Sequence, residues 1–272
     1  MHPAWLSNAY LVADREGGTG VFVDSGAPLG PLHEAVKRLG LTVTHLLTTH
    51  ADPDHVAGDG ELRERYGLQI VKGPLETEGL SFDALPTPGH KDDHLTFVCN
   101  GEAAFTGDVL FKDAVGGGNL AQIRDSVMNV LMKLPPETRV LPGHTDETTI
   151  GREWEQNPFV RVWRGEDPEG TERVQVGGRD ATLIVWSPDY DGKGKAWVRF
   201  DGGEDAIVGG SRVERRGRRP RAHAAVGNVG AAAGRPVRPR RGLDRAGRRR
   251  SGQGQGAAGP ALPERFRARA GG

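Results

Sequence analysis

The chain has 272 residues, of which 26% are charged, and its formal net charge is zero. Residues 213–272 nevertheless carry a net charge of +13 and residues 1–212 a net charge of −13, so an acidic body precedes a basic tail. The single cysteine, Cys99, excludes an intrachain disulfide, and no apolar run approaches the ~20 residues of a membrane-spanning helix. The N-terminus lacks the basic and apolar segments of a secretion signal, so we expect a cytoplasmic protein without a membrane anchor.

Strands and helices alternate along residues 1–160, which predicts one α/β layered domain. Short apolar runs mark the strands, and apolar residues at helical spacing mark the helices. In chain order, the expected elements are strands over 9–13 and 20–24, a helix over 31–39, a strand over 43–47, a helix over 60–66, strands over 68–71, 95–99 and 102–105, a helix over 126–134 and a strand over 139–141.

Two local signals fix the ends of these elements. Asn100-Gly101 suits the positive φ angles of a type I′ turn, so the strands on either side of it are expected to form a hairpin. Asp125 or Ser126 is expected to cap the helix over 126–134, and Pro135 ends it.

Residues 161–212 differ from the body that precedes them. Short strands are expected over 173–176, 182–186, 196–200 and 206–208. This pattern predicts a small antiparallel β appendage, and the sequence does not indicate what the appendage does.

The tail, residues 213–272, is rich in Arg, Gly, Ala and Pro and poor in large apolar residues, so we predict that it is disordered. A basic arm of this kind can bind nucleic acid or another polyanion. The alternative is a spurious extension, such as an out-of-frame translation of a GC-rich gene. The absence of Lys favours the spurious extension, and binding to nucleic acid is expected only through this tail.

Four short segments end in residues that bind divalent metal ions. Each segment follows an apolar run, at the point where a strand gives way to a loop. Imidazole and carboxylate groups are the usual protein ligands of Zn²⁺ and other first-row divalent ions. The candidate ligands are His50, Asp52, Asp54, His55, His90, Asp108 and His144.

The residues before these ligands fit such a site. His90 and His144 each follow Pro-Gly, in which proline fixes the approach and glycine lets the backbone turn sharply beside a metal. Asp108 has two carboxylate oxygens and can therefore bridge two ions spaced ~3.5–4 Å apart. The four segments together predict a centre for two divalent ions.

Several stretches carry a family resemblance. They are Ser7-Asn8-Ala9-Tyr10-Leu11-Val12, Val23-Asp24-Ser25-Gly26, Thr87-Pro88-Gly89-His90, Phe105-Thr106-Gly107-Asp108-Val109-Leu110-Phe111, Leu141-Pro142-Gly143-His144-Thr145 and residues 148–159. Over roughly residues 5–160 the chain resembles the glyoxalase II-like branch of the metallo-β-lactamase superfamily. The resemblance implies an αββα sandwich with the metals at one edge of its two sheets.

The resemblance also implies which ligand holds which ion. The family motif is His-x-His-x-Asp-His, followed later in the chain by two histidines and an aspartate. Matched by position, the first ion takes His50, Asp52 and His90, the second takes Asp54, His55 and His144, and Asp108 bridges them. Asp54 and Asp108 are also the catalytic candidates.

Asp52 departs from the family motif, which has a histidine at this position. A carboxylate adds negative charge and a harder oxygen donor. Zinc remains the expected metal, but Asp52 favours iron or manganese more than imidazole would, and a weakened first site leaves open whether one or two ions bind.

Other residues near the predicted centre are harder to assign. His94 is expected on the surface, with a contact to a ligand residue as the alternative. Asp24 either hydrogen-bonds a ligand histidine or starts the next turn. His45 and Cys99 are expected to pack in the core.

The predicted centre suits hydrolysis of a small-molecule ester or thioester, because a thiol with a pKa of about 8.5 leaves readily. The resemblance points to thioester hydrolysis of the hydroxyacylglutathione hydrolase type. It also implies a helical C-terminal domain that recognises glutathione, and residues 161–212 do not fit that domain. The alternatives are a mononuclear iron persulfide dioxygenase, for which His50, His90 and Asp108 would suffice, and a non-catalytic polyanion binder that acts through the tail.

Overall fold

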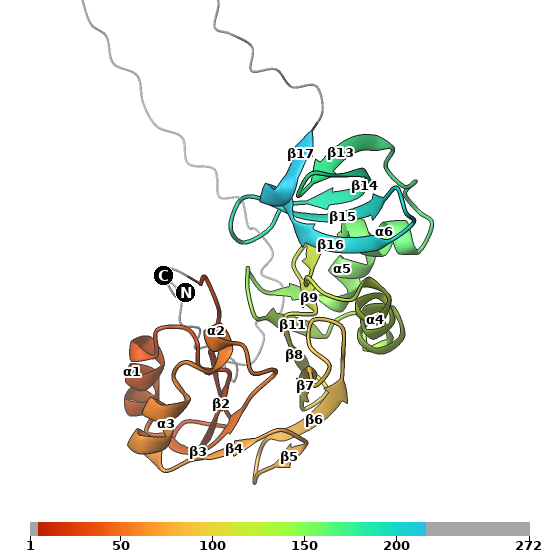
Figure 1. Cartoon of the computed structure of the whole chain (residues 1–272). Coiled ribbons are helices and arrows are strands. Elements are labelled where there is room, and N and C mark those ends of the chain that lie inside the picture. Colours follow the sequence, from red (N-terminus) through yellow and green to blue (C-terminus); the bar gives the residue numbers. More distant parts are fainter. Residues whose placement is uncertain (1–4, 216–272) are drawn as a thin grey trace, which may run out of the picture. The chain divides into compact units, whose positions relative to one another are not determined.

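The computed structural model describes residues 5–215 (Figure 1). Residues 1–4 and 216–272 are outside the described part, and most of the predicted basic tail falls there. No helix among residues 5–215 combines the length and apolar composition needed to cross a bilayer.

The first sheet has the strand order β1-β2-β3-β4. Its strands are β1 (Tyr10–Ala13), β2 (Thr19–Val23), β3 (Thr42–Leu47) and β4 (Gln69–Val71). β1 and β2 form the expected antiparallel pair, whereas β2, β3 and β4 run parallel. Parallel strands need crossover connections, which the helices α1 (Gly30–Leu39) and α3 (Asp59–Tyr66) supply.

The second sheet has the order β12-β11-β8-β7-β6-β5. Its strands are β5 (Leu75–Glu76), β6 (Ser81–Pro86), β7 (Leu95–Cys99), β8 (Ala103–Gly107), β11 (Arg139–Pro142) and β12 (Thr148–Thr149). A two-stranded ribbon of β9 (Leu110–Phe111) and β10 (Ala114–Val115) follows β8. The predicted hairpin joins β7 to β8, and Asn100 and Gly101 have the positive φ angles of 51° and 69° that its turn requires.

The two sheets pack face to face around an apolar core. Tyr10, Val21 and Leu47 of the first sheet meet Phe82 and Phe97 of the second in one buried cluster. In Figure 1, α1 and α3 lie on the outer side of the first sheet and α4 (Leu120–Asp125) on the outer side of the second. This is the predicted αββα arrangement.

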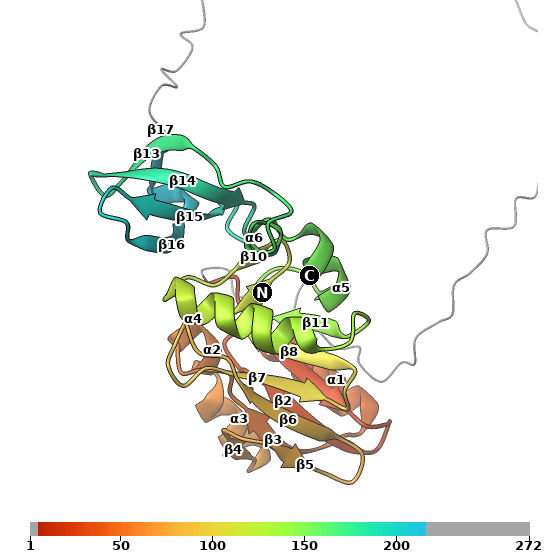
Figure 2. The same cartoon turned by 90° about the vertical axis from the view of Figure 1, so that its right-hand side faces the viewer.

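The helix that covers the second sheet starts earlier than predicted. It begins at Leu120, and the side chain of Asn119 caps it by accepting from the backbone N–H of Gln122. The expectation that Asp125 or Ser126 forms the cap is therefore wrong. The helix continues through a π-helical segment, Ser126–Val130, and a 3-10 turn, Leu131–Lys133. Figure 2 shows it running across the face of β7 and β8.

The β appendage is a five-stranded antiparallel sheet of order β16-β15-β14-β13-β17. Its elements are β13 (Glu172–Val176), β14 (Arg179–Ser187), β15 (Lys195–Phe200), β16 (Asp205–Gly209), the 3-10 turn Gly210–Arg212 and β17 (Val213–Arg215). The helices α5 (Ile150–Gln156) and α6 (Pro158–Trp163) precede it in the chain. The sheet extends three residues beyond the expected end at residue 212.

Candidate metal centre

The four predicted ligand segments lie at the ends of strands from both sheets. His50 follows β3, and the short helix α2 (Pro53–Val56) carries Asp54 and His55. His90 follows β6, Asp108 follows β8 and His144 follows β11. β8 and β11 run parallel, so they deliver Asp108 and His144 at the same edge of their sheet.

All seven predicted ligands come together. In each of three overlapping groups, the nitrogen or oxygen atoms offered to a metal lie within 4.8 Å of one another. The groups are His50-Asp52-His90, His50-His55-Asp108 and Asp54-His55-His144. We refer to His50, Asp52 and His90 as the first position, to Asp54, His55 and His144 as the second position, and to all seven residues as the candidate metal centre.

Asp108 lies between the two positions. Its Oδ1 is 3.3 Å from Nε2 of His55, and its Oδ2 is 3.4 Å from Nε2 of His144 and 3.8 Å from Nε2 of His90. One carboxylate thus faces imidazoles of both positions, as a bridging ligand would.

Backbone carbonyls orient two of the four imidazoles. Nδ1 of His90 lies 2.8 Å from the carbonyl of Gly117, and Nδ1 of His144 lies 3.0 Å from that of Leu6. A carbonyl can only accept, so each Nδ1 carries a proton, and in its neutral form each imidazole presents the Nε2 lone pair to the centre.

A buried carboxylate orients the other two. Nδ1 of His55 lies 2.8 Å from Oδ2 of Asp24, which also accepts from the hydroxyl of Thr49. Because that hydroxyl donates to Asp24, it accepts from Nδ1 of His50, 3.1 Å away. Asp24 therefore contacts a histidine predicted as a ligand, which is the first of the two expectations for it.

Three buried polar atoms of the centre have no hydrogen-bond partner within residues 5–215: Nε2 of His50, Nε2 of His55 and Oδ1 of Asp108. His55 Nε2 and Asp108 Oδ1 are close, but they are not aligned for a hydrogen bond. Buried polar atoms without partners are uncommon and costly unless an ion or water satisfies them. The donor set and these three atoms fit divalent cations.

The charges within the centre are arranged for a cation. Burial lowers the pKa of His50 to about 4, and His55 acts in the same direction. Burial also opposes ionisation of Asp108, but His144 and His55 outweigh it and hold the pKa of Asp108 well below its usual range. Burial lowers the pKa of His144, but Asp108 outweighs it and raises that pKa to about 9. Asp108 is thus ionised among imidazole donors.

Glycine is required next to two of the ligands. A Cβ at Gly143 would collide with Oδ1 of Asp108 and with Cε1 of His55. Gly89 has a φ of 135°, and a Cβ there would strike Ile123. The positive φ of Gly89 fits the sharp turn predicted for glycine in these segments, whereas Gly143 is needed because its neighbours leave no room for a Cβ.

The N-terminal segment holds the loop that carries His144. The backbone N–H of Asn8 donates to the carbonyl of Gly143 over 2.7 Å, and the Asn8 side chain donates to that of Pro142 over 2.9 Å. The hydroxyl of Tyr10 donates to the same Pro142 carbonyl over 2.7 Å. The two ends of residues 5–144 therefore meet at the candidate metal centre.

The comparisons with known proteins agree with this geometry. Residues 2–80 match the model of the family described as "Metallo-beta-lactamase superfamily". The chain is 25% identical to the crystal structure of BLEG-1 B3 metallo-beta-lactamase, with a TM-score of 0.53, over 57% of this chain and 94% of that one. The chain belongs to the metallo-β-lactamase superfamily.

Two further similarities bear on the chemistry. Over 200 residues, the chain is 26% identical to "Hydroxyacylglutathione hydrolase GloC" from Haemophilus influenzae, which covers 58% of this chain and 94% of that protein. The crystal structure of ETHE1 from Myxococcus xanthus is 30% identical, with a TM-score of 0.52, and covers 60% of this chain and 83% of that one. Metallo-β-lactamase superfamily proteins bind divalent metals, and the clustered His and Asp side chains fit that property.

The surface position expected for His94 was wrong, and the alternative, a contact with a predicted ligand residue, is what the structure has. His94 is 1% exposed, and its Nε2 accepts from the backbone N–H of Asp108 over 3.1 Å. Nδ1 therefore carries the proton and faces the hydroxyl of Thr87, 3.0 Å away. His94 is expected to hold the Asp108 loop rather than to bind metal. Of the other two, Cys99 is buried as expected, and His45 is partly buried in β3.

Two residues near the centre were not anticipated from the sequence. Nζ of Lys91 lies 2.7 Å from Oδ1 of Asp52. The ring of Tyr190, in the loop between β14 and β15, stacks on the imidazole of His144 with centroids 4.0 Å apart and an interplanar angle of 13°. Lys91 could have been found from the sequence, because it directly follows His90, a predicted ligand. No pattern in the neighbouring sequence points to Tyr190.

Proposed function

We propose that this metallo-β-lactamase superfamily protein hydrolyses a small-molecule thioester with two divalent ions, zinc foremost, held by the seven residues of the candidate metal centre. The position of Asp108 between the first and second positions is the observation that carries the proposal. Divalent ions bound there would lower the pKa of a bound water to about 7 and polarise the substrate carbonyl. We place the reaction in the cytoplasm, where Cys99 would stay reduced.

The exposed side of the centre is where a substrate can enter. The side chains of His50 and His55 are fully buried, whereas those of Asp52, Asp54 and His90 are 20–27% exposed. A substrate carbonyl therefore approaches from the side of Asp52 and Asp54. The buried imidazoles, oriented by Asp24 and Thr49, keep the opposite side fixed and dry.

A thioester is favoured over an amide because its leaving group needs little protonation. A free thiol has a pKa of about 8.5, so a thiolate departs without a strong acid beside it. The similarity to a hydroxyacylglutathione hydrolase supports the same class. Residues 172–215 form a sheet where the resemblance implies a helical glutathione-binding domain, so the proposal extends to thioesters in general and not to glutathione thioesters alone.

The test uses the full chain with its metal content measured by mass spectrometry. S-lactoylglutathione and a panel of simple acyl thioesters are offered at millimolar concentration with zinc, manganese or iron supplied. We expect thioester hydrolysis, and we expect Asp108→Asn to lose both bound metal and at least 100-fold in kcat. A loaded protein that leaves every thioester intact would overturn the proposal.

A persulfide dioxygenase is the second candidate, since it needs one iron held by two histidines and one aspartate. His90 Nε2 lies 3.8 Å from Oδ2 of Asp108. The ligand atoms of His50 and Asp108 lie within 4.8 Å of each other. A single iron would therefore find three of its ligands together without Asp52. Stoichiometric iron, oxygen uptake and sulfite formation from a glutathione persulfide would favour this function over hydrolysis.

A further inference from the structure

The β appendage reaches the candidate metal centre through one loop. This loop, residues 188–194, joins β14 to β15 and carries Tyr190, whose ring lies parallel to that of His144. The same ring meets Phe111 edge-on with centroids 6.2 Å apart. A residue of the appendage therefore lies directly against a predicted ligand of the second position.

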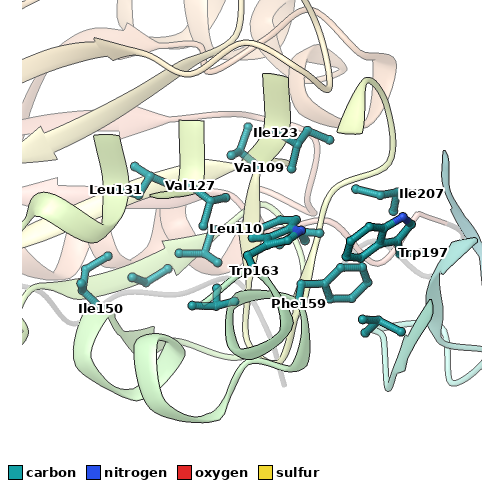
Figure 3. Close-up of a cluster of buried hydrophobic side chains, with 14 of the residues drawn as sticks. Val109, Leu110, Ile123, Val127, Leu131, Ile150, Phe159, Trp163, Trp197 and Ile207 are labelled. Carbon is teal, nitrogen blue, oxygen red and sulfur yellow. The ribbon is translucent and has the colours of Figure 1, made fainter. Parts of the chain in front are cut away.

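Apolar packing fixes the appendage on the catalytic layers. Trp197 and Ile207 of the appendage share one buried cluster with Phe159 and Trp163 of α6 and with Ile123 of α4 (Figure 3). A cluster of this size resists rearrangement, because moving a buried aromatic side chain out of its packing is costly. The loop of Tyr190 is thus mounted on a rigid support.

Polar contacts fix the base of the loop itself. The hydroxyl of Ser187 donates to the carbonyl of Asp113, which lies in the turn between β9 and β10. Nζ of Lys195 lies 3.2 Å from Oδ2 of Asp189, and both side chains are largely buried. Lys195 also lies 5.7 Å from the centroid of the Tyr190 ring. Contacts at both ends of the loop, by Ser187 and by Lys195, therefore fix the position of Tyr190.

A cavity of about 330 Å³ opens between this loop and the catalytic domain. It is lined by residues 112–113, 145–146 and 188–190. Thr145 follows His144 directly, and Tyr190 covers His144, so the cavity adjoins the second position. Its volume is at the lower end of the range found for small-molecule sites.

Among the residues that line the cavity, Lys112 offers a positive charge to a ligand. Asp113 is paired with Arg152 at 2.8 Å, and Asp189 is paired with Lys195. Lys112, in contrast, lies 3.6 Å from Asp146, at a separation too long for a hydrogen bond, and the Asp146 side chain is 69% exposed. An exposed pair of this kind is weak, so a ligand carboxylate can replace Asp146 on Lys112.

We propose that this cavity binds the part of the substrate beyond its reacting carbonyl and selects substrates that carry a carboxylate there. Lys112 contacts the carboxylate, and Tyr190 forms the wall that sets its distance from the candidate metal centre. The proposal rests on the proposed hydrolase function and gives the β appendage a role in substrate selection.

The test compares three thioesters on the metal-loaded full chain: a neutral butyryl thioester, a succinyl thioester of the same neutral thiol, and a butyryl thioester of 3-mercaptopropionate. We expect one of the two anionic substrates to be preferred, which identifies the acyl or the thiol arm as the source of the carboxylate. Lys112→Met is expected to lower the ratio of kcat/KM for the anionic over the neutral substrate about tenfold, through KM, and Lys112→Arg to restore it.

Lys133→Met is the matched control, because Lys133 is an exposed lysine in the 3-10 turn Leu131–Lys133. This variant should keep the wild-type ratio of kcat/KM for the anionic over the neutral substrate. Tyr190→Ala is expected to lose most of the preference for the anionic substrate, while Tyr190→Phe keeps the stacked ring and the preference. If Lys112→Met changes kcat/KM for the anionic and the neutral substrates by the same factor, the proposal of a selective cavity is refuted.

A binding measurement separates this proposal from the proposed function. Succinate and butyramide are titrated into the metal-loaded protein by calorimetry, and we expect succinate to bind at least tenfold more weakly to Lys112→Met. This result would support the cavity even if no thioester is hydrolysed. Succinate binding that persists in Lys112→Met would show that the carboxylate binds at the metals, and it would overturn the proposal.

Discussion

Lys91 and Asp52 form an ion pair at the edge of the candidate metal centre, with Nζ of Lys91 2.7 Å from Oδ1 of Asp52. The other oxygen of Asp52 lies 3.2 Å from Nε2 of His90. One oxygen of the Asp52 carboxylate thus faces the ammonium group of Lys91, and the other faces the imidazole of His90. Lys91 offsets the negative charge that Asp52 adds where the superfamily motif has a neutral imidazole, and it competes with a metal for the same carboxylate.

Asp52→His is expected to raise the zinc affinity of the first position, because it restores an imidazole donor and removes the pair with Lys91. Metal content is measured by mass spectrometry after equilibration with buffered free zinc. The variant should reach two zinc ions per chain at a lower free zinc concentration than the wild type. Unchanged metal content and unchanged kinetics would show that Asp52 is not a ligand.

Lys91→Met should also tighten the first position, in this case severalfold, because it frees both oxygens of Asp52. The effect should shrink as salt is added, since Asp52 and Lys91 are partly exposed. Competition with a zinc chelator at two ionic strengths measures it. Lys72→Met is the control, because Lys72 pairs with Asp93 at 3.4 Å and contacts no predicted ligand. Equal affinities in the two variants would contradict the role given to Lys91.

Gly143→Ala should damage the centre without removing any ligand. Its Cβ would displace Asp108 and His55, and overpacking of this kind costs about 1–3 kcal/mol of stability. We expect a lower melting temperature together with loss of bound metal. Gly73→Ala is the matched control, because a Cβ at Gly73 would have no atom within 4 Å. Full metal content in Gly143→Ala would mean that the loop can move aside.

Cys99 is fully buried in β7, and burial, together with Glu102, raises the pKa of its thiol from 9.0 to about 12. Iodoacetamide at pH 8 should therefore leave the folded protein unlabelled and label it rapidly in urea. Because the folded pKa is the higher one, the stabilising effect of the neutral thiol is complete below pH 9. It is lost as the pH rises from 9 towards 12.

Urea titrations between pH 8 and pH 11 measure this loss, and Cys99→Ser provides the reference without a thiol. The wild type should lose stability more steeply than Cys99→Ser over this range. Parallel curves, or rapid labelling of the native protein, would contradict the burial of Cys99.

The sequence predicted those features that local patterns determine. Asn100-Gly101 specifies its turn through the φ angles it tolerates, and each ligand segment was recognisable from residues next to it in the chain. Helix 126–134 was misplaced at its start, because the helix already begins at Leu120, where the side chain of Asn119 caps it. The continuation into a π-helical segment also breaks the regular spacing on which the prediction relied.

Contacts between distant segments were beyond the reach of these patterns. His94 appeared exposed because nothing in its own segment shows that Asp108, 14 residues later, donates to it. Tyr190 follows His144 by 46 residues and belongs to a different sheet, so its stacking on that ring depends on how the appendage packs. The assignment of residues 1–160 and 161–212 to separate domains stays a prediction.

The contacts of Asn8 and Tyr10 with residues 142–143 have a consequence for how the protein acquires its metal during synthesis. Asn8 and His144 are separated by more than a hundred residues along the chain. A nascent chain therefore cannot close the second position until both sheets have formed and the N-terminal segment has docked. We therefore expect an ion to bind at the second position after the polypeptide has folded, and to stabilise the folded state rather than to nucleate it.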